Sequence, residues 1–227
     1  MAAENGTTDL VCTPHANLTY AFDPKQISLR LAEVATASGN LLRLYSGCDF
    51  HLSFDNIQDA IANPTKYTID HKNHLLVEFS DLVIFRNTAE ILARLQDAGM
   101  IPVLTHPERN DLLRQRIVQI EEWVGAGARV QITAQSFLGD FGRRAKDFSL
   151  TLLEKRLVHF VASDAHDMER RPPRLDLAHA LLKKEHGQEI ADALCIHNPG
   201  AALRGEVLDT PDKDAAAEPR KWYQLWR

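Results

Sequence analysis

The chain has 227 residues, of which 44% are hydrophobic and 25% charged, with a formal net charge of −5. This length and apolar content suit one domain with its own core, and the mildly acidic charge predicts no nucleic-acid partner. No apolar run reaches the ~18 residues of a membrane span, and no basic-then-apolar leader opens the sequence. Because Cys12, Cys48 and Cys195 form no paired framework, we expect reduced thiols and a cytoplasmic protein.

Predicted strands and helices alternate along the chain, after a short helical turn at Met1–Asn5 that Gly6 ends. The expected strands cover 9–13, 41–46, 74–78, 101–105, 128–133 and 158–163. One expected helix starts at Asp23-Pro24, and two others cover 55–62 and 88–98. Two more are indicated by the apolar residues from Leu113 to Val124 and from Leu150 to Leu157. A further helix runs from Pro172-Pro173 to Leu182, and a last short helix ends at about Cys195. This alternation predicts parallel βα units, hence a barrel or a doubly wound sheet.

The predicted organisation is one domain over residues 1–208 and a C-terminal tail over 209–227. The first half of the tail is polar and rich in Ala and Pro, which predicts a flexible extension. Its aromatic end, Trp222 to Trp226, is expected to pack on its own domain or on a neighbour.

The stretch from Val158 to Asp167 is an apolar run that ends in Asp164 and His166. Because side chains alternate along a strand, these two emerge on the same side just past its end. Parallel α/β folds keep their chemistry at this end of their strands. The alternative is a polar turn in which Asp164 caps the next helix.

The other predicted strand ends carry the same types of side chain. They are His15, Asp49, Glu78 and His106. A barrel would bring all of them to one rim beside Asp164 and His166, where they exceed the ligands of one tetrahedral ion. We therefore expect two or three ions with bridging carboxylates, and the mixed N and O ligands favour Mn, Fe, Zn or Mg.

Arg109 follows His106 closely enough to reach the same rim. Its planar guanidinium suits bidentate binding of a phosphate, although a structural salt bridge with Glu108 or another acid is the alternative. From the residues alone, the prediction is metal-assisted hydrolysis of a phosphoester or a similar bond.

Several motifs occur in the order known from one family. They are Thr13-Pro14-His15, Leu76-Val77-Glu78, Thr105-His106-Pro107-Glu108-Arg109, the segment from Gln135 to Gly142, and Ala162-Ser163-Asp164-Ala165-His166. The sequence resembles the bacterial PHP-type (polymerase and histidinol phosphatase) phosphoesterases. Within them it is most similar to the manganese-dependent protein-tyrosine phosphatases of capsular and exopolysaccharide operons.

The resemblance implies a distorted, TIM-like (β/α)7 barrel with three metal ions, Mn²⁺ preferred, acting on a phosphotyrosine protein such as a bacterial tyrosine kinase of polysaccharide export. The positions matching family ligands are His15, Glu78, His106, Asp164 and His166. Asp49 stands where the family usually has glutamate, and its shorter reach leaves a bridging role open. Arg109 matches the arginine used on the phosphate, with His106 and Asp164 at the catalytic centre. Tyr20 matches a tyrosine that contacts substrate or packs.

One departure from the family concerns its first strand, which carries an Asp-x-His-x-His-like motif. That strand and most of the following helix have no counterpart here. Three explanations are possible. The start codon was assigned too late or the chain was shortened, the motif has really been lost, or another chain supplies the missing strand. The last of these predicts a homo-oligomer formed through exposed strand edges.

The competing functions are a small-molecule phosphatase similar to histidinol phosphatase, and a catalytically impaired binding protein.

Overall fold

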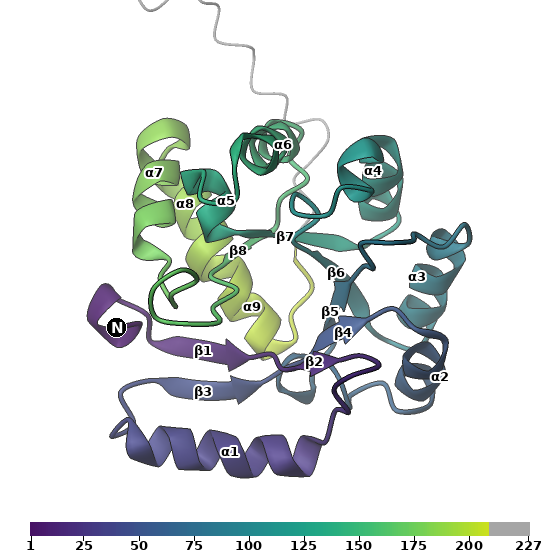
Figure 1. Ribbon diagram of the computed structural model, residues 1–227, viewed down its shortest axis with the longest axis horizontal. Coiled ribbons are helices and arrows are strands. Elements are labelled where there is room, and N and C mark those ends of the chain that lie inside the picture. Colours follow the sequence, from purple (N-terminus) through teal and green to yellow (C-terminus); the bar gives the residue numbers. More distant parts are fainter. Residues whose placement is uncertain (209–227) are drawn as a thin grey trace, which may run out of the picture.

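The structure is a computed structural model that describes residues 1–208 (Figure 1). The predicted tail over 209–227, with its aromatic end Trp222 to Trp226, lies outside the described residues.

The strands are parallel, and those from β4 to β8 neighbour one another in chain order. Their bounds are β1 Asp9–Cys12, β2 His15–Ala16, β3 Arg43–Ser46, β4 Asp49–His51, β5 His74–Glu78, β6 Ile101–Thr105, β7 Arg129–Thr133 and β8 Phe160–Ala162. β1 and β3 form a 2-stranded sheet, and the others form a 6-stranded sheet in the order β2-β4-β5-β6-β7-β8. The two sheets are continuous, because the Gly47 amide donates to the Cys12 carbonyl and the Asp49 amide donates to the Pro14 carbonyl.

Helices connect these strands. The helical segments are η1 Ala3–Asn5, α1 Pro24–Ala37, α2 Phe54–Ala62, η2 Ile69–His71, α3 Thr88–Asp97, η3 Leu113–Gln115, α4 Ile117–Gly125, α5 Ala134–Leu138, α6 Arg143–Glu154, α7 Asp176–His186, α8 Gln188–Asp192, η4 Ala193–His197 and α9 Asn198–Arg204. Because right-handed crossovers that move steadily along a sheet stay on one face, the connecting helices form an outer layer. Figure 1 shows them around the strands.

The inner face of the sheet packs on a small apolar cluster. Leu76 of β5, Val103 of β6 and Phe160 of β8 meet Ala202 of α9 and Leu208 there. β5 and β8 are not adjacent in the strand order, so their shared cluster shows that the sheet curves around it. The predicted α/β class with parallel strands is confirmed. Closure into a barrel stays a prediction, because no ladder joins β8 to β1 or β2 within residues 1–208.

Gly47 permits the close pairing of β1 with β3. A Cβ atom at this position would lie 2.8 Å from Cγ1 of Val11, closer than real contacts allow. Glycine is therefore required where the chain passes from β3 into β4 and so toward Asp49.

The helix predicted to start at Pro172-Pro173 begins later, at Asp176. The Asp167 carboxylate accepts hydrogen bonds from the amides of Glu169, Arg170 and Arg171, which holds this segment in a tight turn. This turn ends at Arg171, before the Pro172-Pro173 pair, and α7 begins after that pair.

The structure also bears on the expectations about membrane spans and cysteines. The described residues contain no helix with the length and apolar content to span a bilayer. Cys12, Cys48 and Cys195 are free thiols, as expected.

Candidate metal and phosphate site

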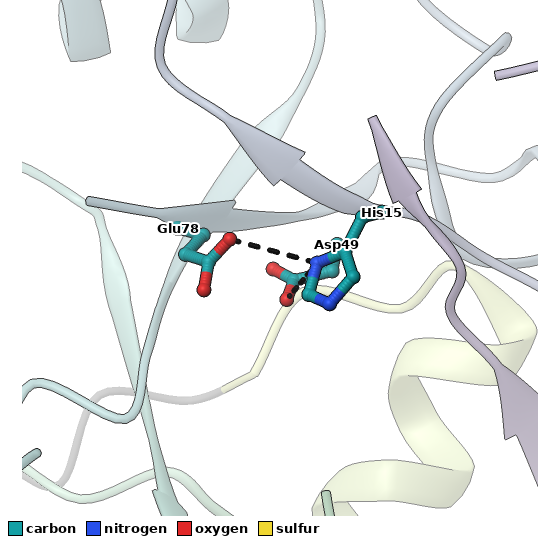
Figure 2. A group of neighbouring side chains, drawn as sticks. All are labelled: His15, Asp49 and Glu78. Carbon is teal, nitrogen blue, oxygen red and sulfur yellow. Dashed lines mark ion pairs between the residues drawn. The ribbon is translucent and has the colours of Figure 1, made fainter. Parts of the chain in front are cut away.

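Three predicted ligands meet on β2, β4 and β5, where His15 begins β2, Asp49 begins β4 and Glu78 ends β5 (Figure 2). Nδ1 of His15 lies 3.1 Å from Oδ2 of Asp49 and 3.6 Å from Oε2 of Glu78. One potential ligand atom from each residue lies within 4.8 Å of the others. His15 and Asp49 are direct register partners on neighbouring strands, so the backbone itself brings them together.

Asn56 of α2 fixes this corner of the site. Its side-chain amide donates to the carbonyl of Ala16 at 2.8 Å and to that of His51 at 2.9 Å. One side chain therefore ties the end of β2 to the end of β4. This link holds His15 and Asp49 in register.

His106 adds a fourth predicted ligand from the end of β6. Its Nε2 lies 3.7 Å from Oε1 of Glu78. The backbone of His106 has φ 34°, a left-handed conformation that is uncommon outside glycine and that clusters at functional sites. Burial lowers the pKa of His106, so its imidazole is neutral near pH 7, and neutral imidazole is the form that binds metals.

Asp164 and His166 complete the set from the end of β8. Asp164 also has positive φ, at 48°. Nδ1 of His166 lies 3.8 Å from Oδ1 of Asp164, and its ring centroid is 6.1 Å from that of His15. Because β2 and β8 end the strand order on opposite sides, this contact brings the two edges of the curved sheet together at the site.

Two arginines converge on Asp164. Nη1 of Arg109 and Nη2 of Arg171 both donate to Oδ2 of this carboxylate. The two guanidinium groups also lie 4.4 and 5.9 Å from the ring centroid of Phe141. Arg109 does form the ion pair that the alternative predicted, with Asp164 rather than with Glu108. Phosphate binding by Arg109 stays a prediction.

Glu108 supports the loop that carries Arg109. It is fully buried, and its Oε1 accepts from the Thr133 amide at 3.0 Å and from the Ser136 hydroxyl at 2.6 Å. Burial raises the pKa of Glu108 to about 7. This carboxyl group therefore connects the segment after β6 to α5.

The ligand set fits a divalent cation. Burial, followed by the charges of Glu78 and Asp164, raises the pKa of Asp49 to about 8. Oδ1 of Asp49 is buried and has no hydrogen-bond partner among the described residues. A buried carboxylate with a free oxygen beside other acids lacks the positive charge that a bound cation supplies.

Beside these ligands lies a cavity of about 110 Å³, bordered by Glu78, His106 and Arg109. Tyr20 is 59% exposed. Its ring stacks on that of His15, with the centroids 6.2 Å apart and an interplanar angle of 24°. All predicted site residues thus gather at one end of the sheet.

Sequence reasoning missed two residues near this site. Nδ1 of His51, the last residue of β4, lies 3.8 Å from Oε2 of Glu78. Its position two residues after Asp49 on one strand was a usable signal, because such residues share a face. Arg171 was not among the predicted site residues, and nothing in its spacing from Asp164 indicates their contact.

Comparison with known proteins gives the family. The chain matches the family described as "Capsular polysaccharide synthesis, CpsB/CapC" over residues 1–204, and it belongs to that family. The resemblance predicted from the motifs is confirmed.

Individual relatives of this chain carry names that agree with this family. The chain is 36% identical to the putative tyrosine-protein phosphatase CapC of Staphylococcus aureus, with 99% of this chain and 89% of that protein covered. It is 31% identical to the tyrosine-protein phosphatase YwqE of Bacillus subtilis, with 91% and 82% covered. It also superposes with a TM-score of 0.85 and 30% identity on a crystal structure from work on YwqE of B. subtilis and CpsB of Streptococcus pneumoniae, described as unique metal-dependent tyrosine phosphatases. That match covers 92% of this chain and 86% of the other.

Proposed function

We propose that this protein is a metal-dependent protein-tyrosine phosphatase that acts on a tyrosine kinase of polysaccharide biosynthesis in the cytoplasm. One observation carries the proposal: Asp164, a predicted metal ligand, is also the shared partner of Arg109 and Arg171. Cation ligands and phosphate-binding side chains therefore meet at one carboxylate. The names of the relatives support the substrate class.

The proposed ligands form one set around the rim. They are His15, Asp49, Glu78, His106, Asp164 and His166. They would hold two or three ions, with Mn²⁺ preferred over Fe, Zn or Mg. When bound, such ions lower the pKa of water and neutralise phosphoryl charge.

The side chains beside the proposed metal ligands bind the phosphoryl group. The guanidinium groups of Arg109 and Arg171 bind the phosphoryl oxygens and stabilise the charge that grows on them. Asp164 orients both groups, and the ring of Phe141 supports them. The leaving group is a phenolate whose conjugate acid has a pKa near ~10, so a strong general acid is not required.

The exposure of the rim favours a protein substrate over a small molecule. The side chains of His15 and His166 are 34% and 40% exposed. Leu18, after β2, and Leu82, after β5, are 95% and 91% exposed. An accessible site with apolar neighbours suits a phosphotyrosine on another protein, whereas a small substrate is usually enclosed.

The proposal extends to the architecture. We infer that the curved sheet is the distorted TIM-like barrel expected from the resemblance. Strands in chain order, and the contact between His15 and His166 from opposite edges of the sheet, support this inference.

The test is turnover of three substrates after metal removal and Mn²⁺ restoration: a phosphotyrosine peptide, the same peptide with phosphoserine, and histidinol phosphate. We expect Mn²⁺-dependent turnover with the phosphotyrosine peptide preferred, and loss of turnover in His106→Ala. The matched control is His197→Ala, because His197 is exposed on η4. Preference for histidinol phosphate, or peptide binding without turnover, would favour the competing functions instead.

A further inference from the structure

His51 shares a surface with the proposed ligands. It is the direct register partner of Glu78, just as His15 is that of Asp49. Asp49 and His51 are two residues apart on β4, so their side chains leave the same face of the strand. The pairing of β2, β4 and β5 therefore places two imidazoles and two carboxylates in one compact array.

The spacing within this array is that of donors around an ion. Nδ1 of His51 and Nδ1 of His15 lie 3.8 and 3.6 Å from the same oxygen, Oε2 of Glu78. Hydrogen bonds between such atoms span only about 2.7–3.2 Å. Metal–ligand bonds of about 2.0–2.2 Å place two donors of one tetrahedral ion roughly 3.3–3.6 Å apart. Small side-chain rotations would bring both imidazoles onto an ion bound by Glu78.

The backbone holds His51 in place for this role. The carbonyl of His51 accepts from the Asn56 side chain at 2.9 Å, and the Leu52 amide donates to the Glu78 carbonyl at 3.2 Å. The His51 side chain is 27% exposed, so it is neither packed in the core nor free on the surface. Within residues 1–208, the ring of His51 forms an ion pair with Glu78 and with no other acid.

We propose that His51 is a further metal ligand, which binds through its imidazole the same divalent ion as Glu78 and His15. This inference rests on the proposed function. Strand β4 would then supply two ligands, Asp49 and His51. The side chain of His51 is longer and reaches farther from the strand than that of Asp49.

The test is a Mn²⁺ titration of the full chain, followed through the electron paramagnetic resonance signal of free Mn²⁺, with His51→Gln. The matched control is His71→Gln, because His71 is exposed in η2 at the opposite end of β5 from Glu78. We expect His51→Gln to weaken binding of one ion by at least about 10-fold, while the control binds as the natural protein does. Thermal unfolding in EDTA should match for all three proteins, and Mn²⁺ should raise the Tm of His51→Gln least.

A crystal structure with Mn²⁺ separates a ligand from a residue that only positions Glu78. We expect a ring nitrogen of His51 at bonding distance from an ion. An unchanged isotherm for His51→Gln, or a His51 ring turned away from the metal, would overturn the inference. If the natural protein still binds Mn²⁺ and hydrolyses a phosphotyrosine peptide in that case, the proposed function stands without it. If the natural protein binds no Mn²⁺, both are overturned.

Discussion

Arg109 and Asp164 form an ion pair that joins the segment after β6 to the segment after β8. Arg171 reaches the same carboxylate oxygen from the far side of the turn at Asp167. Each arginine is about one quarter exposed or less, at 25% and 21%, so both are shielded from bulk water yet open to a ligand. We propose that this arrangement holds two guanidinium groups ready for one phosphoryl group.

We therefore expect Arg109→Ala and Arg171→Ala each to lower kcat/KM for a phosphotyrosine peptide by about 100-fold, because each removes a donor to the transition state. Mn²⁺ content should stay unchanged. Steady-state kinetics with elemental analysis checks both. Arg143→Ala is the control, since Arg143 is 92% exposed and forms its ion pair with Asp147 of the same helix, α6. Equal kinetics in Arg171→Ala and the control would remove Arg171 from the site.

Ser136 is expected to stabilise the fold through Glu108. Ser136→Ala leaves the buried Glu108 carboxylate without a hydroxyl donor, which should lower the free energy of unfolding by about 1–3 kcal/mol. Ser149→Ala is the matched control, because Ser149 is equally buried and only donates to the Ala145 carbonyl within its own helix. Urea unfolding measures both variants. If both variants lose the same free energy of unfolding, the hydrogen bond from Ser136 to Glu108 stabilises the fold no more than an ordinary buried hydrogen bond does.

Acid should destabilise the protein through two histidines at the opposite end of the strands from the site. Burial, together with the charge of Arg129, lowers the pKa of His74 and of His159 to about 4. The unfolded chain binds these protons near pH 6.5, so the native state loses stability as the pH falls from about 6.5 to about 4. Near pH 4, the loss in the free energy of unfolding approaches about 3 kcal/mol per histidine.

His74→Phe tests this pH dependence. The side chain of His74 is fully buried, its Nε2 has no partner among the described residues, and its ring meets that of Phe160 edge-on. Phenylalanine keeps a ring there but binds no proton. Urea unfolding at pH 7.5, 5.5 and 4.5 should therefore show a shallower decline for the variant. Parallel declines would mean that His74 is not the group that titrates.

Tyr20 is expected to act on substrate binding. It stacks on His15 while most of its surface is exposed, so Tyr20→Ala should raise KM for a phosphotyrosine peptide several-fold with little change in kcat or in Tm. Tyr20→Phe keeps the ring and should behave as the natural protein does. A fall in Tm with an unchanged KM would show that Tyr20 serves packing.

The sequence by itself determined the order of the elements and the end of the sheet where the site lies. Alternating βα patterns predict parallel strands, and parallel strands share one carboxyl end, so His15, Asp49, Glu78, His106 and Asp164 had to gather there. Local rules sufficed because each of these predicted ligands either ends a strand, as Glu78 ends β5, or lies within three residues after one.

Only the tertiary structure decided which of these side chains meet and what else joins them. The contact between His51 and Glu78 depends on the register of β4 against β5. The contact of Arg171 with Asp164 depends on the turn at Asp167, and that of His15 with His166 depends on the curvature of the whole sheet. Register and curvature are set by packing around Leu76, Val103 and Phe160, which lie far apart in the chain. Such long-range packing leaves no periodic signal in the sequence.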